Sequence, residues 1–228
     1  SSVGATTWIS GLGGEDGNHS PAIMTTDQSG CDKGYVRAGN VFANTFDNAA
    51  NPPLENSGCN YTSSFKATSA AAPSVVGGIA LVLEERPDLS FRDVKGILAA
   101  SAQKIDTEFE PVVVDGITYY DWVDNAAGYS HHNWYGFGRF DVDRAVALAT
   151  DYDSTALGPQ TISGWEDNVS EEFITVPAGN EAASSITTTV KGTLEFVRVR
   201  LDLSAPGIKE MGVRLTSPSG TTVTLFQP

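Results

Sequence analysis

The segment 67–73, with the sequence ATSAAAP, places a serine where an apolar helix is expected to begin. In the first turn of a helix the backbone N–H groups lack partners within the helix, and the helix dipole favours negative charge. Ser69 could therefore act as a nucleophile, with its own backbone N–H donating to the oxyanion that forms when a carbonyl is attacked. The same position also suits an ordinary N-cap serine, so the cap alone does not decide between the two roles.

Other catalytic motifs are missing from the sequence. It holds no G-x-S-x-G elbow, no phosphate-binding G-x-x-x-x-G-K-[ST] loop and no H-E-x-x-H pair. The glycine-rich segment 11–17 resembles a dinucleotide-binding loop only weakly, because its third glycine comes one place late and no helix is expected after it.

A long helix is expected over 69–86, with Thr68 and Ser69 as cap candidates. It is apolar on nearly every face, which predicts a buried helix. Its paired glycines, Gly77 and Gly78, should each cost roughly 1 kcal/mol of helix stability. Their presence indicates close packing against a neighbouring backbone.

Two shorter helices and several strands are expected around it. One helix follows Ser90, with Asp93 three residues later as a weak relative of the capping box, and another covers 142–150. The remaining expected elements are strands over 5–10, 21–26 and 41–45, a long surface loop over 48–63, and a hairpin over 111–123.

The pattern changes after residue 158. In LEFVRVRLDL at 194–203, apolar and charged residues alternate with a period of two, which is typical of a half-buried strand. The sequence SPSG at 217–220 predicts a tight turn. The other strands expected here are 173–176, 186–190, 212–216 and 221–226. We interpret 1–150 as one domain, 151–157 as a linker and 158–228 as the start of a β-sandwich or barrel.

Charge and composition exclude some classes of protein. The 228 residues carry a net charge of −14, which argues against a nucleic-acid-binding surface and against a basic membrane patch. No apolar run approaches the ~20 residues of a membrane span. The acidity and the Asn-, Ser- and Thr-rich loops suit a secreted or extracellular protein. We expect the chain, which starts without Met, to be a piece of a longer precursor.

The two cysteines, Cys31 and Cys59, flank a loop-rich stretch. They could be two buried free thiols or a disulfide of a secreted protein, and the composition favours the disulfide. Their spacing does not indicate a zinc site.

Several segments together resemble the subtilisin-like serine proteases, in particular the kexin and proprotein-convertase branch. The matching strings are TSAAAPSVVGGIALVLE (68–84), PDLSFRDVKGIL (87–98), IMTTD (23–27) and NWYGFGRFD (133–141). The segment 174–226, with LTSPSG at 215–220, resembles the P domain that follows convertase catalytic domains. This resemblance implies that 1–150 is the C-terminal part of an α/β domain, with buried helices on a parallel sheet. It also implies that 158–228 is the first part of an all-β jelly-roll P domain.

The resemblance assigns the nucleophile to Ser69 and implies peptide-bond hydrolysis through an acyl-enzyme, with proteins or peptides as substrates. In this family the catalytic Asp, the catalytic His and the oxyanion Asn precede the serine, in motifs that this chain lacks. The upstream half of the catalytic domain is therefore an expected partner, and the chain alone is expected to be inactive. Nothing around His19 resembles the family's histidine motif, and we assign structural or surface roles to His131 and His132.

Three departures from the family pattern leave an alternative open. The family usually has glycine where Ala67 stands and a small residue where Lys66 stands. Convertases also carry a Glu close to the position of Val3 that helps to hold calcium beneath the specificity pocket. Calcium is expected as a structural ion of the parent enzyme, but its ligands in this chain are unknown and a strict dibasic preference is in doubt. The alternative is a non-catalytic, subtilisin-shaped binding or scaffolding protein.

Overall fold

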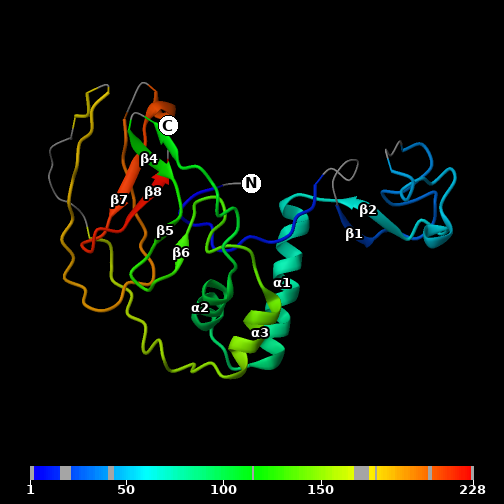
Figure 1. Cartoon of the computed structure of the whole chain (residues 1–228), viewed down its shortest axis with the longest axis horizontal. Coiled ribbons are helices and arrows are strands. Elements are labelled where there is room, and N and C mark those ends of the chain that lie inside the picture. The colour runs from blue at the N-terminus through cyan, green and yellow to red at the C-terminus, as the bar shows by residue number, and fades with distance from the viewer. Residues whose placement is uncertain are drawn as a thin grey trace. The chain divides into compact units, whose positions relative to one another are not determined.

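The computed structural model describes residues 3–15, 22–40, 44–114, 116–166, 175–177, 179–204 and 207–226. The chain divides into two units, Ser1–Ser154 with Gly207–Pro228, and Thr155–Pro206. The described helices are α1 (Thr68–Glu85), α2 (Phe91–Ser101) and α3 (Val142–Thr150), labelled in Figure 1. The strands are β1 (Ile23–Thr26), β2 (Tyr61–Phe65), β3 (Val112–Val114), β4 (Ile117–Tyr120), β5 (Val123–Asp124), β6 (Ser130–His131), β7 (Val213–Thr216) and β8 (Thr222–Phe226). Short 3-10 turns cover Leu54–Asn56 and Ile208–Glu210.

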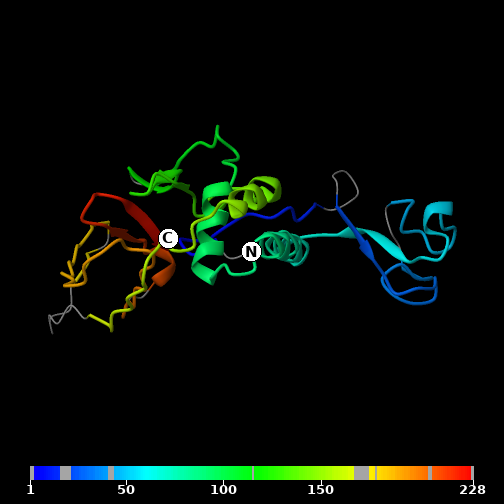
Figure 2. The same ribbon diagram turned by 90° about the horizontal axis from the view of Figure 1, so that it is seen from below.

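The three helices enclose the hydrophobic core of the first unit. Helix α3 packs against both α1 and α2, and the views in Figures 1 and 2 agree on this arrangement. The buried members of the core are Val82, Leu89, Val94, Ile97, Leu98, Ala145 and Ala149. The small side chains of α3 let the helices approach closely, as the apolar stripe expected for 142–150 predicts.

Local capping explains where two of the helices begin. The Ser90 side chain accepts a hydrogen bond from the Asp93 backbone N–H, and the Asp93 side chain accepts one from the Ser90 N–H. This is a full capping box, where the sequence indicated only a weak relative of one. At α3 the Asp141 carboxylate accepts a hydrogen bond from the Arg144 N–H at 3.0 Å.

The prediction that the long apolar helix is buried on all sides is wrong for this chain. Helix α1 buries Ala70, Gly78 and Val82, but Val76 and Leu81 remain 63% and 49% exposed. One stripe of α1 contacts α3 and the loop that holds Gly11 and Gly13. Its other face has no covering element in the described part of the chain.

The expected parallel sheet is not observed among the described residues. Strands form four separate two-stranded antiparallel pairs, β1–β2, β3–β4, β5–β6 and β7–β8. The parallel pairing recorded between described residues is an isolated bridge from Ser10 to Arg139. A parallel sheet needs neighbouring strands brought together by crossovers, and the described residues supply antiparallel pairs instead.

Other expectations for the N-terminal segments have mixed outcomes. The strand expected at 21–26 is confirmed as β1, and the hairpin at 111–123 as β3–β4. Residues 5–10 form no strand beyond the Ser10 bridge. Most of the strand expected at 41–45 lies outside the described residues. The segment 48–63 is not only a surface loop, because it includes a buried Asn56 and the start of β2.

The last strands of the chain form the expected hairpin. Strand β7 pairs with β8, and the turn closes through hydrogen bonds from Ser217 N–H to the Thr221 carbonyl and from Gly220 N–H to the Ser217 carbonyl, both 2.9 Å. The Asn133 side chain donates a hydrogen bond to the Thr224 carbonyl of β8 at 2.8 Å and so attaches this hairpin to segment 131–136.

The second unit contains no helix or strand among its described residues. The strands expected at 186–190 and 194–203 are therefore absent here, and the described part of 173–176 is not a strand. Val197, Val199 and Leu201 are 43%, 41% and 44% exposed. Alternation supplies one apolar face, but a strand also needs a neighbour for its backbone hydrogen bonds. None of the helices that the structure describes has the length and apolarity needed to cross a bilayer.

Candidate active site

Ser69 lies in the first turn of α1 and is exposed. The expectation that Thr68 or Ser69 caps the helix is wrong, because Thr68 is already helical and the N-cap residue is Ala67. Ala67 has φ 69° and ψ −165°, a backbone conformation that glycine adopts almost alone. The chain makes this turn in the two residues between the end of β2 and the start of α1.

The groups around the Ser69 hydroxyl are open to a ligand. The N–H groups of Ala70 and Ala71 both donate to the Ala67 carbonyl, at 3.0 and 3.1 Å. Neither the backbone N–H nor the hydroxyl of Ser69 has a hydrogen-bond partner among the described residues. This arrangement presents a hydroxyl and an adjacent N–H donor at the positive end of a helix dipole.

The glycine-rich loop lies against the start of α1, a role that the sequence did not reveal. A Cβ on Gly13 would lie 2.9 Å from the Ala67 carbonyl oxygen, and one on Gly11 would lie 2.7 Å from the Ala71 oxygen. Glycine at these two positions therefore lets the loop approach the helix backbone that carries Ser69. The next described element is strand β1 and not a helix, so the weak dinucleotide-loop interpretation is not supported.

The histidines are not assembled with Ser69 among the described residues. His19 lies outside them. The His131 Nε2 atom is 2.8 Å from the Thr7 carbonyl oxygen, and the His132 Nδ1 atom accepts a hydrogen bond from the Trp134 N–H at 3.0 Å. Both contacts hold the chain in place, as expected for structural roles.

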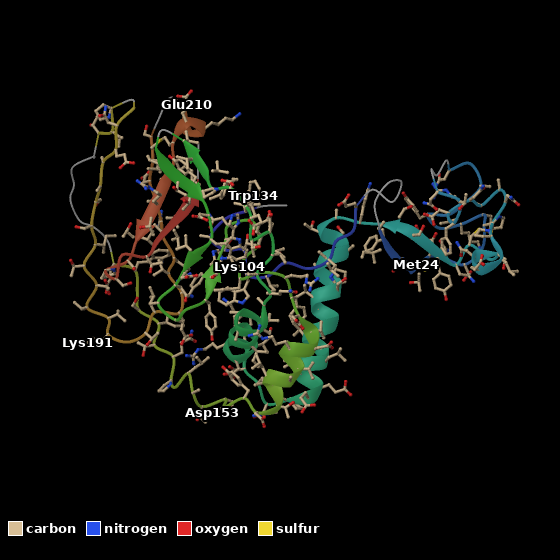
Figure 3. All side chains as sticks on the ribbon, in the orientation of Figure 1. Met24, Lys104, Trp134, Asp153, Lys191 and Glu210 are labelled. Carbon is tan, nitrogen blue, oxygen red and sulfur yellow. A yellow bond between two sulfur atoms is a disulfide. The ribbon has the colours of Figure 1, made fainter. Side chains whose placement is uncertain are left out.

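His132 is the centre of an aromatic cluster made of Phe109, Tyr120, Trp122, His132, Trp134 and Tyr135. Its ring stacks on Tyr135 with centroids 4.8 Å apart and meets Phe109 edge to face at 4.8 Å. The Lys104 ammonium lies 5.0 Å from the centre of the Trp122 ring, and Figure 3 labels Lys104 and Trp134 in this region.

Burial controls the protonation of these groups. It lowers the pKa of both His131 and His132 below the ordinary value of 6.5. At His132 the neighbouring His131 lowers the pKa further, while Asp121 and Asp106 oppose the shift. The Tyr135 hydroxyl donates to Asp106 at 2.6 Å, and this hydrogen bond raises the pKa of Tyr135 to about 12.

The loops before β2 are held by a disulfide and by two carboxylates. Cys31 and Cys59 form a disulfide with their Cα atoms 5.0 Å apart, which confirms the favoured pairing. Burial alone would raise the pKa of Asp27, but hydrogen bonds from the backbone N–H groups of Val36, Tyr35 and Gln28 hold it below 3.8. Asp47 is fully buried and accepts hydrogen bonds from Thr62 and Ser64 of β2.

A metal site is not found in this part of the chain. Among the described residues, no three His, Cys, Asp or Glu side chains lie close enough together to hold an ion. The structural calcium expected for the intact protein stays a prediction.

The glycines of the matching string at 133–141 are explained by close contacts. Gly136 has φ 63°, and a Cβ there would lie 2.5 Å from the backbone of Trp8. Gly138 has φ 127° and meets the Gln103 carbonyl. These glycines let the segment lie against the backbone of Trp8 on one side and of Gln103, just after α2, on the other.

Residues 16–138 match the Subtilase family, peptidase S8. This match covers more than half of the chain, so the chain belongs to the subtilase family. The resemblance to subtilisin-like and kexin-like proteases is thereby confirmed.

Two relatives and a solved structure show which members it is similar to. The Aeromonas extracellular serine protease of Aeromonas sobria is 35% identical over 241 residues, covering 100% of this chain and 38% of that protein. Protease KEX1 of Kluyveromyces lactis is 33% identical over 168 residues, covering 69% of this chain and 20% of that protein. The crystal structure of the Aeromonas sobria serine protease aligns with a TM-score of 0.60 and 35% identity, covering 66% of this chain and 27% of that chain. This chain thus spans well under half the length of these relatives, and its described fold is that of part of a subtilase.

Proposed function

We propose that this chain is the C-terminal part of a serine endopeptidase, with Ser69 as its nucleophile. The observation that carries the proposal is the exposed Ser69 hydroxyl beside an unpaired backbone N–H in the first turn of α1, in a chain of the subtilase family. The serine proteases among its relatives support the same activity.

The proposed reaction is acyl transfer. The Ser69 Oγ atom attacks the peptide carbonyl carbon while a histidine takes the hydroxyl proton. The Ser69 backbone N–H donates to the developing oxyanion. The C–N bond then breaks, the histidine returns the proton to the leaving amine, and water hydrolyses the acyl ester. The catalytic His, its Asp partner and the oxyanion Asn are proposed to come from upstream of this chain.

The upstream half of the domain is also the proposed partner of α1. The exposed side chains of Val76 and Leu81 lie on the face of α1 that no described element covers. Helices of this apolarity are normally buried on all sides. In the intact protein we propose that an upstream sheet covers this face.

Three further features of the intact protein belong to the proposal. Residues 158–228 are proposed to start a jelly-roll P domain, supported by the β7–β8 hairpin and by the alternating segment 194–203. The protein is proposed to be secreted, which agrees with the Cys31–Cys59 disulfide and the extracellular Aeromonas relative. A structural calcium ion is proposed for the intact protein, with ligands outside the described residues.

Labelling with a fluorophosphonate serine probe tests the nucleophile. We expect labelling only when the chain is extended upstream by roughly 250 residues, about the length of one domain. Ser69→Ala should abolish it. Ser74→Ala is the matched control, because the Ser74 hydroxyl is already bonded to the Ala70 carbonyl at 2.9 Å, and it should label like the wild type.

A non-catalytic scaffold is the second candidate. The observation that favours it is the methyl group of Ala67 in a glycine-type conformation directly before Ser69, with Lys66 alongside. Absence of labelling in the extended protein, with folding intact, would contradict the endopeptidase and support the scaffold.

A further inference from the structure

Lys66 is the charged residue nearest to Ser69 in the chain. It lies between the end of β2 at Phe65 and the turn at Ala67, and its side chain is exposed. Three residues span at most about 11 Å, and the lysine ammonium sits on a flexible four-carbon stem. The Lys66 and Ser69 Cα atoms are therefore at most about 11 Å apart, a gap that a lysine stem and a substrate side chain can span together.

The surroundings of Lys66 leave its charge available. The first turn of α1 contains no acidic residue. Among the described residues, none of the carboxylates pairs with the Lys66 ammonium within 4.0 Å. Within the segment 61–83 Lys66 is the one charged residue, in a chain whose net charge is −14.

We infer that Lys66 makes the intact enzyme prefer substrates with an acidic side chain next to the scissile bond; this inference rests on the proposed function of Ser69. A Glu or Asp of the peptide at this point would meet an unpaired ammonium at the edge of the site. A Lys or Arg at the same point would be repelled by it. An exposed pair at about 4 Å interacts by about 1 kcal/mol in water, which corresponds to roughly a five-fold preference.

The test uses the upstream-extended protein and sets of fluorogenic peptides. Each set is identical except for Glu, Gln or Lys at one position flanking the cleaved bond. The wild type should show a kcat/KM for the Glu peptide roughly five-fold above that for the Gln peptide at low salt. The preference should appear in KM, because the charge contact is already made in the bound substrate. It should shrink in 0.5 M salt, where exposed charges are screened.

Variants of Lys66 separate charge from side-chain size. Lys66→Gln should remove the Glu-over-Gln preference, Lys66→Glu should reverse it in favour of the Lys peptide, and Lys66→Arg should keep it. Lys191→Glu is the matched control, since it changes the net charge equally at an exposed position in the second unit, labelled in Figure 3. It should leave the preference unchanged.

The outcomes distinguish the two proposals. Hydrolysis of all peptides with equal kcat/KM, or a preference that survives Lys66→Gln, would overturn the assignment of Lys66 and leave the endopeptidase standing. Failure to hydrolyse any peptide, together with no probe labelling at Ser69, would overturn the proposed function and this inference with it.

Discussion

Ala67 holds the backbone in a conformation that its side chain disfavours. A non-glycine residue with φ 69° and ψ −165° carries a strain on the order of 1–3 kcal/mol. The family pattern has glycine at this position, and the structure supplies the physical reason for that preference.

Ala67→Gly should therefore stabilise the chain by about 1 kcal/mol, after allowing for the added flexibility of glycine in the unfolded state. Urea unfolding of the two proteins measures the difference. Ala72→Gly, in the ordinary helical conformation of α1, is the matched control and should destabilise by about 1 kcal/mol. Equal losses of stability in the two variants would show that the Ala67 backbone is not strained.

His132 makes the stability of the chain depend on pH. Its Nδ1 atom accepts a hydrogen bond from Trp134, so the neutral ring carries its proton on Nε2. Because burial lowers the pKa of His132 in the folded state, the unfolded state binds the proton more strongly. The contribution of His132 is therefore fully present above pH 6.5 and is lost as the pH falls below that value toward the folded pKa.

We expect the free energy of unfolding to fall between pH 7.5 and pH 5, and His132→Asn to weaken this fall. The Asn side-chain oxygen can replace Nδ1 as the acceptor for the Trp134 N–H, but it does not titrate. The variant should lose on the order of 2–3 kcal/mol at pH 7.5 through poorer packing in the aromatic cluster. Urea titrations at several pH values measure both effects, and an unchanged pH slope would show that His132 is not the group responsible.

At the scale of elements, the two adjacent glycines of α1 differ in how closely other residues approach them. A Cβ on Gly78 would collide with the Phe140 ring and would lie 2.9 Å from Val142, whereas one on Gly77 would meet nothing within 4 Å. The expectation of close packing against a backbone is thus wrong for Gly77 in this chain. For Gly78 the close neighbours are side chains rather than backbone.

Gly78→Ala should destabilise the chain by roughly 1–3 kcal/mol, because the α1–α3 contact has no room for a methyl group. Gly77→Ala should stabilise it by about 1 kcal/mol through helix propensity alone. Chemical denaturation of the two variants side by side provides the measurement. Equal effects of the same sign would contradict the packing described here.

At the scale of the whole molecule, the chain leaves much apolar surface in contact with water. Exposed side chains include those of Val76, Leu81, Ile162 and Leu194, which are 63%, 49%, 77% and 70% exposed. Surface of this kind on a folded protein marks an interaction site or an incomplete core. The buried core of the first unit is limited to three helices and the segments packed on them.

We therefore expect this chain alone to be marginally stable and to bind a hydrophobic dye such as ANS. The upstream-extended protein should bind much less dye if the proposed upstream half covers α1. Dye fluorescence and a thermal melt of both proteins provide the measurement. A cooperative melt of the chain alone above ~65 °C, beyond the usual range of mesophilic domains, would contradict this expectation.

The sequence predicted features that depend on neighbours along the chain. The capping box of Ser90 and Asp93 spans three residues, the SPSG turn spans four, and the apolar stripe of α3 repeats within one helix. The position of Ser69 at the start of a helix was visible for the same reason. Local hydrogen bonds and helical periodicity depend on residues that are close together in the sequence. The serine motif is a stretch of this kind.

Tertiary structure decided what distant residues do to one another. It brought Cys31 and Cys59 together, placed Gly11 and Gly13 against the backbone of α1, and gathered the aromatic cluster around His132. It also left 194–203 without strand structure, although its alternation predicted a strand. Strand pairing, helix burial and close backbone contacts require a second segment, and no local pattern states which segment that is or whether it is present.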